Sequence, residues 1–166
     1  ATATAPFFKK LSLEMGGKNP NIVFADAEFD SAVDMAVKAS FSNQGQICLC
    51  GSRLFVQEDI YDKFKSDFIE KTRNLVVGDP RENSSNLGAV VSKQHMEKIL
   101  SKIEQAKDEG GTVITGGNRL QLDGELKNGY YIEPTIIEGL PADCQTNHEE
   151  IFGPVVSMIP FKSEED

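Results

Sequence analysis

Short apolar runs alternate along the chain with longer segments whose apolar residues recur every three or four positions. The runs at 21–25, 54–56, 113–115 and 155–161 predict buried strands. Helical spacing predicts three helices, one from Asp30 to the polar turn at Asn43, one from Ile60 to before Gly78, and one from Ser92 to Gly110. Strands that alternate with helices predict an α/β fold, with a largely parallel open sheet flanked by helices.

Two segments are predicted to depart from this regular alternation. The stretch from Arg119 to Asn128 mixes charged residues with Gly124 and predicts an exposed loop. The stretch 131–137 has the composition of a strand but contains Pro134, which lacks a backbone N–H. We therefore expect this strand either to kink or to lie at an edge of the sheet.

Composition narrows the class of protein. The chain has 166 residues, enough for one domain, and a net charge of −9. That charge argues against a nucleic-acid partner, and the absence of a long apolar stretch argues against a membrane partner. Three cysteines, Cys48, Cys50 and Cys144, imply no disulfide framework, and no zinc-binding spacing accompanies them. A reducing, cytoplasmic location and no metal are expected.

The two ends of the chain do not have the composition expected of protein termini. The first residue is not Met, and the last four, Ser163–Asp166, have the composition of a helix start. We therefore expect the chain to be a fragment.

Cys48 is a candidate nucleophile, because a thiolate attacks carbonyl carbon when a base can take its proton or its pKa is lowered. It lies just beyond the first predicted helix, after the polar turn Asn43–Gln46. Most cysteines are simply small buried apolar residues. If the segment is extended, Cys50 would face the same side, so spacing does not choose between the two thiols.

Glu14 is a candidate general base. Its neighbours Leu13 and Met15 are apolar, and burial among them would make its carboxylate more basic. Gly16 and Gly17 follow and permit close backbone approach. The alternative is an ordinary surface glutamate.

A third candidate segment is Glu150-Ile151-Phe152-Gly153-Pro154, immediately before the last predicted strand. The Glu150 carboxylate can accept both hydroxyls of a ribose, and the Phe152 ring can pack on a flat heterocycle. A charged loop that leads into the core would explain the run equally well.

Together, these segments resemble the NAD(P)-dependent aldehyde dehydrogenase superfamily. The family's glutamate motif corresponds to Leu13–Pro20, its cysteine motif to Asn43–Cys48 and its cofactor motif to Glu150–Pro154, in the same order. Gly129–Thr135 also matches, so the resemblance covers nearly the whole chain. The setting Ile47–Cys50 is similar to that of 2-aminomuconate and 2-hydroxymuconate semialdehyde dehydrogenases.

The resemblance implies a role for each candidate residue. It selects Cys48 over Cys50 as the nucleophile and makes Glu14 the general base. Glu150 would bind the nicotinamide ribose, Phe152 would pack near the nicotinamide ring, and the Met15 backbone would lie beside the carboxamide. By its place in the third helix, Lys98 would lie near the adenosine ribose.

The implied activity is oxidation of an aldehyde to a carboxylic acid through a Cys48 thioester, with NAD, or NADP, as cofactor. Family members are much longer than this chain. Residues 1–166 would then be part of the catalytic domain, without the N-terminal dinucleotide-binding domain and the C-terminal oligomerisation segment. The parent enzyme would be a homo-oligomer, and the isolated chain would be inactive.

Two other activities remain open. A CoA-acylating or phosphorylating relative would pass the acyl group to another acceptor and would commonly lack Glu14. A non-catalytic structural or regulatory relative would be free to lose Cys48 or Glu14. Both residues are present, which favours hydrolysis of the thioester.

Overall fold

The computed structural model describes residues 1–166, and its regular elements alternate as the periodicity predicts. The α-helices are α1 (Phe29–Phe41), α2 (Glu58–Arg73), α3 (Lys93–Asp108) and α4 (Gln145–His148). Three 3-10 helices are η1 (Ala5–Phe7), η2 (Ser42–Gly45) and η3 (Gly124–Asn128). The strands are β1 (Pro20–Val23), β2 (Arg53–Gln57), β3 (Thr112–Thr115), β4 (Arg119–Leu120), β5 (Tyr131–Ile132), β6 (Thr135–Glu138) and β7 (Val155–Phe161).

Five strands form one mostly parallel sheet in the order β1-β2-β7-β6-β3. The first four are parallel to one another, and β3 runs antiparallel to β6. The strands β4 and β5 form a separate antiparallel pair. The predicted α/β class, a largely parallel open sheet flanked by helices, is confirmed.

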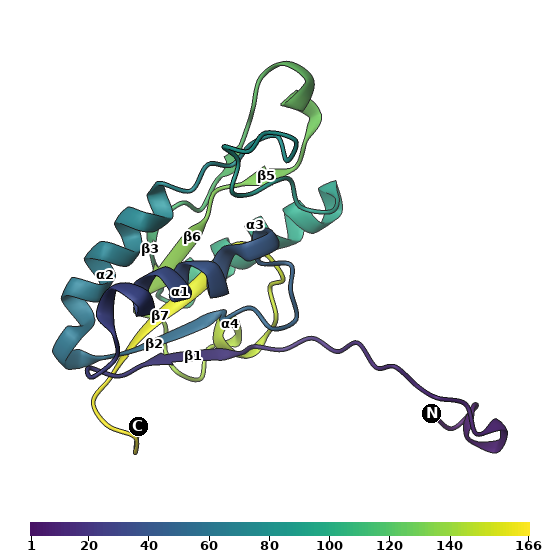
Figure 1. Ribbon diagram of the computed structural model, residues 1–166, viewed down its shortest axis with the longest axis horizontal. Coiled ribbons are helices and arrows are strands. Elements are labelled where there is room, and N and C mark those ends of the chain that lie inside the picture. The colour runs from purple at the N-terminus through teal and green to yellow at the C-terminus, as the bar shows by residue number, and fades with distance from the viewer.

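Side chains on alternate faces of the strands build two apolar cores. Ile136 and Val156 face α1 and α2, which lie together on one side of the sheet (Figure 1). Ile137 and Val155 face the other way and pack with Ile99 and its neighbours on α3. The sheet therefore has helices on both faces, as parallel sheets require.

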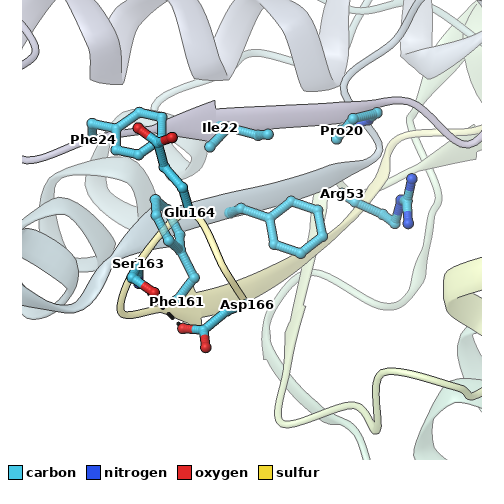
Figure 2. Close-up of a pocket in the computed structure, with 9 residues that line it drawn as sticks. Pro20, Ile22, Phe24, Arg53, Phe161, Ser163, Glu164 and Asp166 are labelled. Carbon is cyan, nitrogen blue, oxygen red and sulfur yellow. Dashed lines mark hydrogen bonds between the residues drawn. The ribbon is translucent and has the colours of Figure 1, made fainter.

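The part of the sheet formed by β1 and β2 is open on the face opposite α1, because α3 does not extend over these two strands. There, Ile22 is 53% exposed, and the side chains of Pro20, Phe24 and Phe161 lie around a hollow of about 580 Å³ (Figure 2). Arg53 lies at one end of this hollow, and none of the candidate site residues lines it. The N-terminal residues before β1 extend away from the body of the fold (Figure 1).

Two predicted helix boundaries differ from the structure. Asp30 does not cap α1, because the helix already begins at Phe29, after Glu28 at the N-cap. The second helix ends at Arg73 and not near Gly78, since Val77 instead forms a bridge with Leu87. The start of α3 is confirmed: the Ser92 hydroxyl accepts a hydrogen bond from the His95 N–H at 3.1 Å.

Pro134 separates two strands and does not mark an edge of the sheet. It falls between β5 and β6, so no hydrogen bond of either ladder is lost. The edge alternative is wrong, because β6 lies between β7 and β3. The prediction of a loop over 119–128 is also incomplete, since the segment begins with β4, which pairs with β5.

No helix of this chain is long and apolar enough to cross a membrane.

Candidate active site

The residues selected from three distant segments meet at one cavity. It has a volume of about 570 Å³ and is lined by all five expected site residues, Glu14, Met15, Cys48, Glu150 and Phe152. Gly16, Gln46, Ile47, His95 and Lys98 complete its lining. The fold thus brings the glutamate, cysteine and cofactor segments together, although more than 130 residues separate Gly17 from Glu150, which are in direct contact.

Cys48 reaches this cavity because the chain turns sharply after α1. Asn43 and Gln44 have φ angles of 50° and 56°, in the left-handed region. The Asn43 side-chain amide donates to the Gln46 carbonyl at 3.1 Å and fixes this reversal. Backbone strain of this kind needs support from the surrounding structure and concentrates at functional sites.

The two neighbouring thiols are in different environments. The Cys50 N–H donates to the Ile47 carbonyl at 3.0 Å, so the segment forms a turn and is not extended. Cys48 is half-buried at the cavity, whereas Cys50 is only 9% exposed. Burial raises the pKa of the Cys50 thiol, which disfavours its thiolate at neutral pH. Geometry therefore favours Cys48 as the nucleophile.

The backbone at Cys48 offers one free hydrogen-bond donor. Its N–H donates to no group of the chain, while its carbonyl accepts from the Asn19 side chain at 2.6 Å. A free N–H adjacent to a nucleophile is suited to stabilise an oxyanion that forms on the attacked carbonyl.

Glu14 lines the cavity, but the expected burial around it is wrong for this chain. Leu13 and Met15 are 72% and 75% exposed, and Glu14 is exposed as well. The segment that holds them belongs to no helix or strand until β1 begins at Pro20. With Leu13 and Met15 this exposed, their apolar side chains do not exclude water from the carboxylate.

Glu150 lies directly on the glycine pair that follows Glu14. The Gly17 N–H donates to its Oε1 at 3.2 Å, and a Cβ atom at Gly16 would come within 2.1 Å of its Oε2. The two glycines therefore permit the close approach that their positions predict. Oε2 makes no hydrogen bond within the chain and remains available to a ligand.

Phe152 is held by a residue that the sequence reasoning did not select. Phe152 has φ 59°, and its carbonyl lies 2.6 Å from Nε2 of His95. The two rings meet edge to face, with centroids 6.1 Å apart. His95 and Lys98 both project from the first turns of α3 into the cavity lining. In the sequence, a role for His95 at the site is indicated only by its place three residues after the Ser92 cap, on the same helix as Lys98.

No group of three or more histidine, cysteine, aspartate or glutamate side chains is arranged to hold a metal ion. The chemistry available at the cavity is that of a thiol, carboxylates, an imidazole and an amine.

Comparisons with known proteins give relatives that match nearly the whole chain. The chain is 47% identical over 165 residues to the 2-aminomuconic semialdehyde dehydrogenase of Mus musculus, covering 98% of this chain and 34% of that protein. It is 43% identical to the 4-trimethylaminobutyraldehyde dehydrogenase A of Danio rerio, covering 95% and 31% respectively. The chain thus spans about a third of the length of these relatives.

A solved structure shares the fold. The betaine aldehyde dehydrogenase of Staphylococcus aureus, in complex with NAD+, matches with a TM-score of 0.90 and 39% sequence identity, over 99% of this chain and 32% of that chain. The model of the aldehyde dehydrogenase family matches residues 1–166. This chain belongs to the aldehyde dehydrogenase family.

Proposed function

We propose that this chain carries the nucleophile and the general base of an NAD(P)-dependent enzyme that oxidises an aldehyde to a carboxylic acid. The observation that carries the proposal is the single cavity lined by Cys48, Glu14 and Glu150. In this proposal residues 1–166 are part of a catalytic domain. The parent enzyme is a cytoplasmic homo-oligomer.

The cavity fits the nicotinamide end of a dinucleotide. Glu150 presents the free Oε2 as an acceptor for ribose hydroxyls, and the half-buried Phe152 ring offers an apolar face for a flat heterocycle. The Met15 backbone borders the same space. When bound there, NAD or NADP supplies a hydride acceptor.

The residues of the chain divide the remaining chemistry between them. The Cys48 thiolate forms a bond to the aldehyde carbon, and the carbonyl electron pair moves to oxygen, where the Cys48 N–H stabilises it. Loss of hydride from that carbon leaves an acyl thioester on Cys48. Glu14 then takes a proton from water, the hydroxyl adds to the acyl carbon, and the acid departs as the thiolate is released.

A CoA-acylating or phosphorylating reaction is the runner-up. Such an enzyme would protect the thioester from water, whereas Glu14 lies at the same cavity as Cys48. A non-catalytic role is less favoured still, because it would require neither residue at the cavity.

The first aldehydes to test follow from the relatives. The identity of 47% with a 2-aminomuconic semialdehyde dehydrogenase makes that semialdehyde the first substrate to test, and 4-trimethylaminobutyraldehyde the second. With either, we expect no NADH formation from the isolated chain, because it spans about a third of the relatives. Turnover comparable to a complete enzyme would contradict this expectation.

The roles of Cys48 and Glu14 are testable without a cofactor. A thiolate at Cys48 attacks p-nitrophenyl acetate, releases p-nitrophenolate and becomes acetylated, and water activated by Glu14 removes the acetyl group. Release of p-nitrophenolate is followed by absorbance, and acetylation is located by mass spectrometry.

Three variants separate the roles. Cys48→Ser should abolish acetylation at this position. Glu14→Gln should keep the initial burst but slow the steady rate by about 100-fold, because the acetyl group stays on Cys48. Cys144→Ser is the matched control and should change neither phase. Equal steady rates in the parent chain and the Glu14→Gln variant would refute the proposed base.

A further inference from the structure

Asn19 joins the glutamate segment to the cysteine loop through both protons of its side-chain amide. Its Nδ2 donates to the carbonyl of Cys48 at 2.6 Å and to the carbonyl of Cys50 at 3.2 Å. We propose that Asn19 is a positioning residue that holds the Cys48 N–H and thiol toward the cavity. The inference rests on the proposed function, in which Cys48 is the nucleophile.

Apart from Asn19, the C-terminal side of the cysteine loop is held by backbone bonds around Cys50, whose N–H donates to the Ile47 carbonyl and whose carbonyl accepts from the Ser52 N–H. Leu49, between the two bonded carbonyls, is 80% exposed, and the loop belongs to no helix or strand. On its N-terminal side Gln46 accepts from the Val91 N–H at 3.1 Å. The Cys48 carbonyl, in contrast, has no partner besides Asn19. Without that bond, the turn closed by the Cys50 N–H and the Ile47 carbonyl would be the main restraint on the peptide between Cys48 and Leu49.

Only an amide satisfies this arrangement fully. Bridging the carbonyls of Cys48 and Cys50 takes two donors from one short side chain, and the Asn NH₂ group supplies both, although the Cys50 carbonyl also accepts from the Ser52 N–H at 2.9 Å. A serine hydroxyl supplies one donor, and an ionised aspartate supplies none and repels both carbonyls. Gly17 leaves room for the amide, because a Cβ atom there would come within 2.9 Å of its Oδ1.

The backbone of Asn19 is itself fixed against the strand that follows the cysteine loop. Its carbonyl accepts from the Arg53 N–H at 3.2 Å, and the Lys18 carbonyl accepts from Arg53 Nε at 3.0 Å. These bonds extend the β1–β2 pairing, which begins at Pro20 and Arg53. The backbone of Asn19 is therefore fixed by the sheet, and its side chain anchors the cysteine loop, which lies outside the sheet.

The position of Asn19 also links Glu14, the proposed base, to Cys48, the proposed nucleophile. Asn19 follows Glu14 by five residues, and Gly17 between them donates to Glu150. One short segment thus carries Glu14, anchors Glu150 and orients Cys48. Displacement of a reacting group by about 1 Å is enough to slow a reaction roughly 100-fold, so this coupling bears directly on catalysis.

The test measures the reactivity of each thiol in the intact chain. The chain is treated with iodoacetamide under native conditions, and mass spectrometry of peptides gives the alkylation rates of Cys48 and Cys50 separately. In the parent chain Cys48 should react faster, because Cys50 is buried. In Asn19→Asp the ratio of the two rates should fall by about tenfold, as the loop opens and Cys50 gains access. Asn19→Ser, with one donor, should give an intermediate ratio.

Two control variants distinguish a loss of positioning by Asn19 from a general loss of stability of the chain. Asn118→Asp removes an amide that donates to the Gly116 carbonyl and to the Glu133 carboxylate in an exposed loop that lines no part of the cavity, so it reproduces the loss of a doubly bonded amide elsewhere. Ile103→Val removes a methyl group from the core beneath α3 and lowers stability without touching the loop. Both control variants should keep the ratio of Cys48 to Cys50 alkylation rates that the parent chain shows.

An unchanged ratio in folded Asn19→Asp and Asn19→Ser would overturn the positioning role. So would an equal fall of the ratio in Ile103→Val, which would show that loss of stability alone opens the loop. If circular dichroism shows that Asn19→Asp does not fold, Asn19→Ser decides by the same criteria. The measurement uses neither ester nor aldehyde, so its failure and a failure of the proposed Glu14 and Cys48 chemistry are read separately.

Discussion

Gly45 lies directly against the backbone of Gly153. A Cβ atom at Gly45 would come within 2.0 Å of the Gly153 carbonyl oxygen, and Gly45 has a φ of 69°. The contact joins the cysteine motif, three residues before Cys48, to the cofactor motif, one residue after Phe152. Two segments of the site therefore meet backbone to backbone, at a distance that no side chain permits.

Gly45→Ala should destabilise the chain by about 3 kcal/mol. Roughly 1 kcal/mol comes from placing an L side chain in the left-handed region, and the remainder comes from the clash with a backbone atom that cannot rotate away. Gly124→Ala is the matched control, because Gly124 has φ 61° but nothing lies within 4 Å of its added Cβ atom. Urea unfolding should show a loss of only about 1 kcal/mol there. Equal losses would mean that the Gly45–Gly153 contact adds nothing.

The three thiols should differ in their reactivity toward iodoacetamide. Burial raises the pKa of both Cys50 and Cys144, so each has less thiolate at neutral pH than an ordinary cysteine. Cys48, at the cavity, should be alkylated first at pH 7, and the rates at Cys50 and Cys144 should rise steeply as pH increases. In urea the three rates should converge. Faster reaction at Cys50 or Cys144 in the native chain would contradict the assignment of Cys48.

The fold was largely predictable because its signals are local. The apolar spacing of Phe64 and Phe68 marks one buried face of α2, and the Ser92 cap marks the start of α3. Such patterns depend on neighbours three or four residues away. The place of β6 inside the sheet depends instead on which strands pair with it, and Pro134 alone does not reveal this.

The residues that line the cavity were predictable from the sequence, but their contacts were not. Cys48, Glu14 and Glu150 follow from motifs, and the cavity confirms that they meet. The difference between Cys48 and Cys50 depends on a turn, and the exposure of Glu14 depends on what packs over its segment. Both are tertiary properties, which a linear pattern of apolar neighbours does not contain.

Glu109 should make stability depend on pH in the acid range. Burial opposes its ionisation, but hydrogen bonds from Gln105 and Thr146 outweigh this and lower its pKa to about 2. Because the folded pKa lies below the unfolded value near 4.5, its contribution is complete above about pH 4.5 and is lost as pH falls toward about 2.

Glu109→Gln is the corresponding variant. It should lower Tm at pH 7 but leave Tm nearly unchanged at the acid end of that range, where the parent carboxylate is becoming protonated. Glu104→Gln is the control, since it removes only an exposed ion pair with Lys107 and should have little effect at any pH. A loss of Tm in Glu109→Gln that is the same at every pH would contradict the titration.

His95 should hold Phe152 in its left-handed conformation. A carbonyl oxygen only accepts, so the Nε2 atom that lies 2.6 Å from the Phe152 carbonyl must carry the proton. Long-range ¹H–¹⁵N NMR spectra of the imidazole ring should show this tautomer directly. His95→Ala should cost about 1–2 kcal/mol by urea unfolding, because it leaves the Phe152 carbonyl without its donor. His95→Gln retains a donor and should recover part of that loss, whereas equal losses in both variants would show that ring packing, and not the hydrogen bond, supports Phe152.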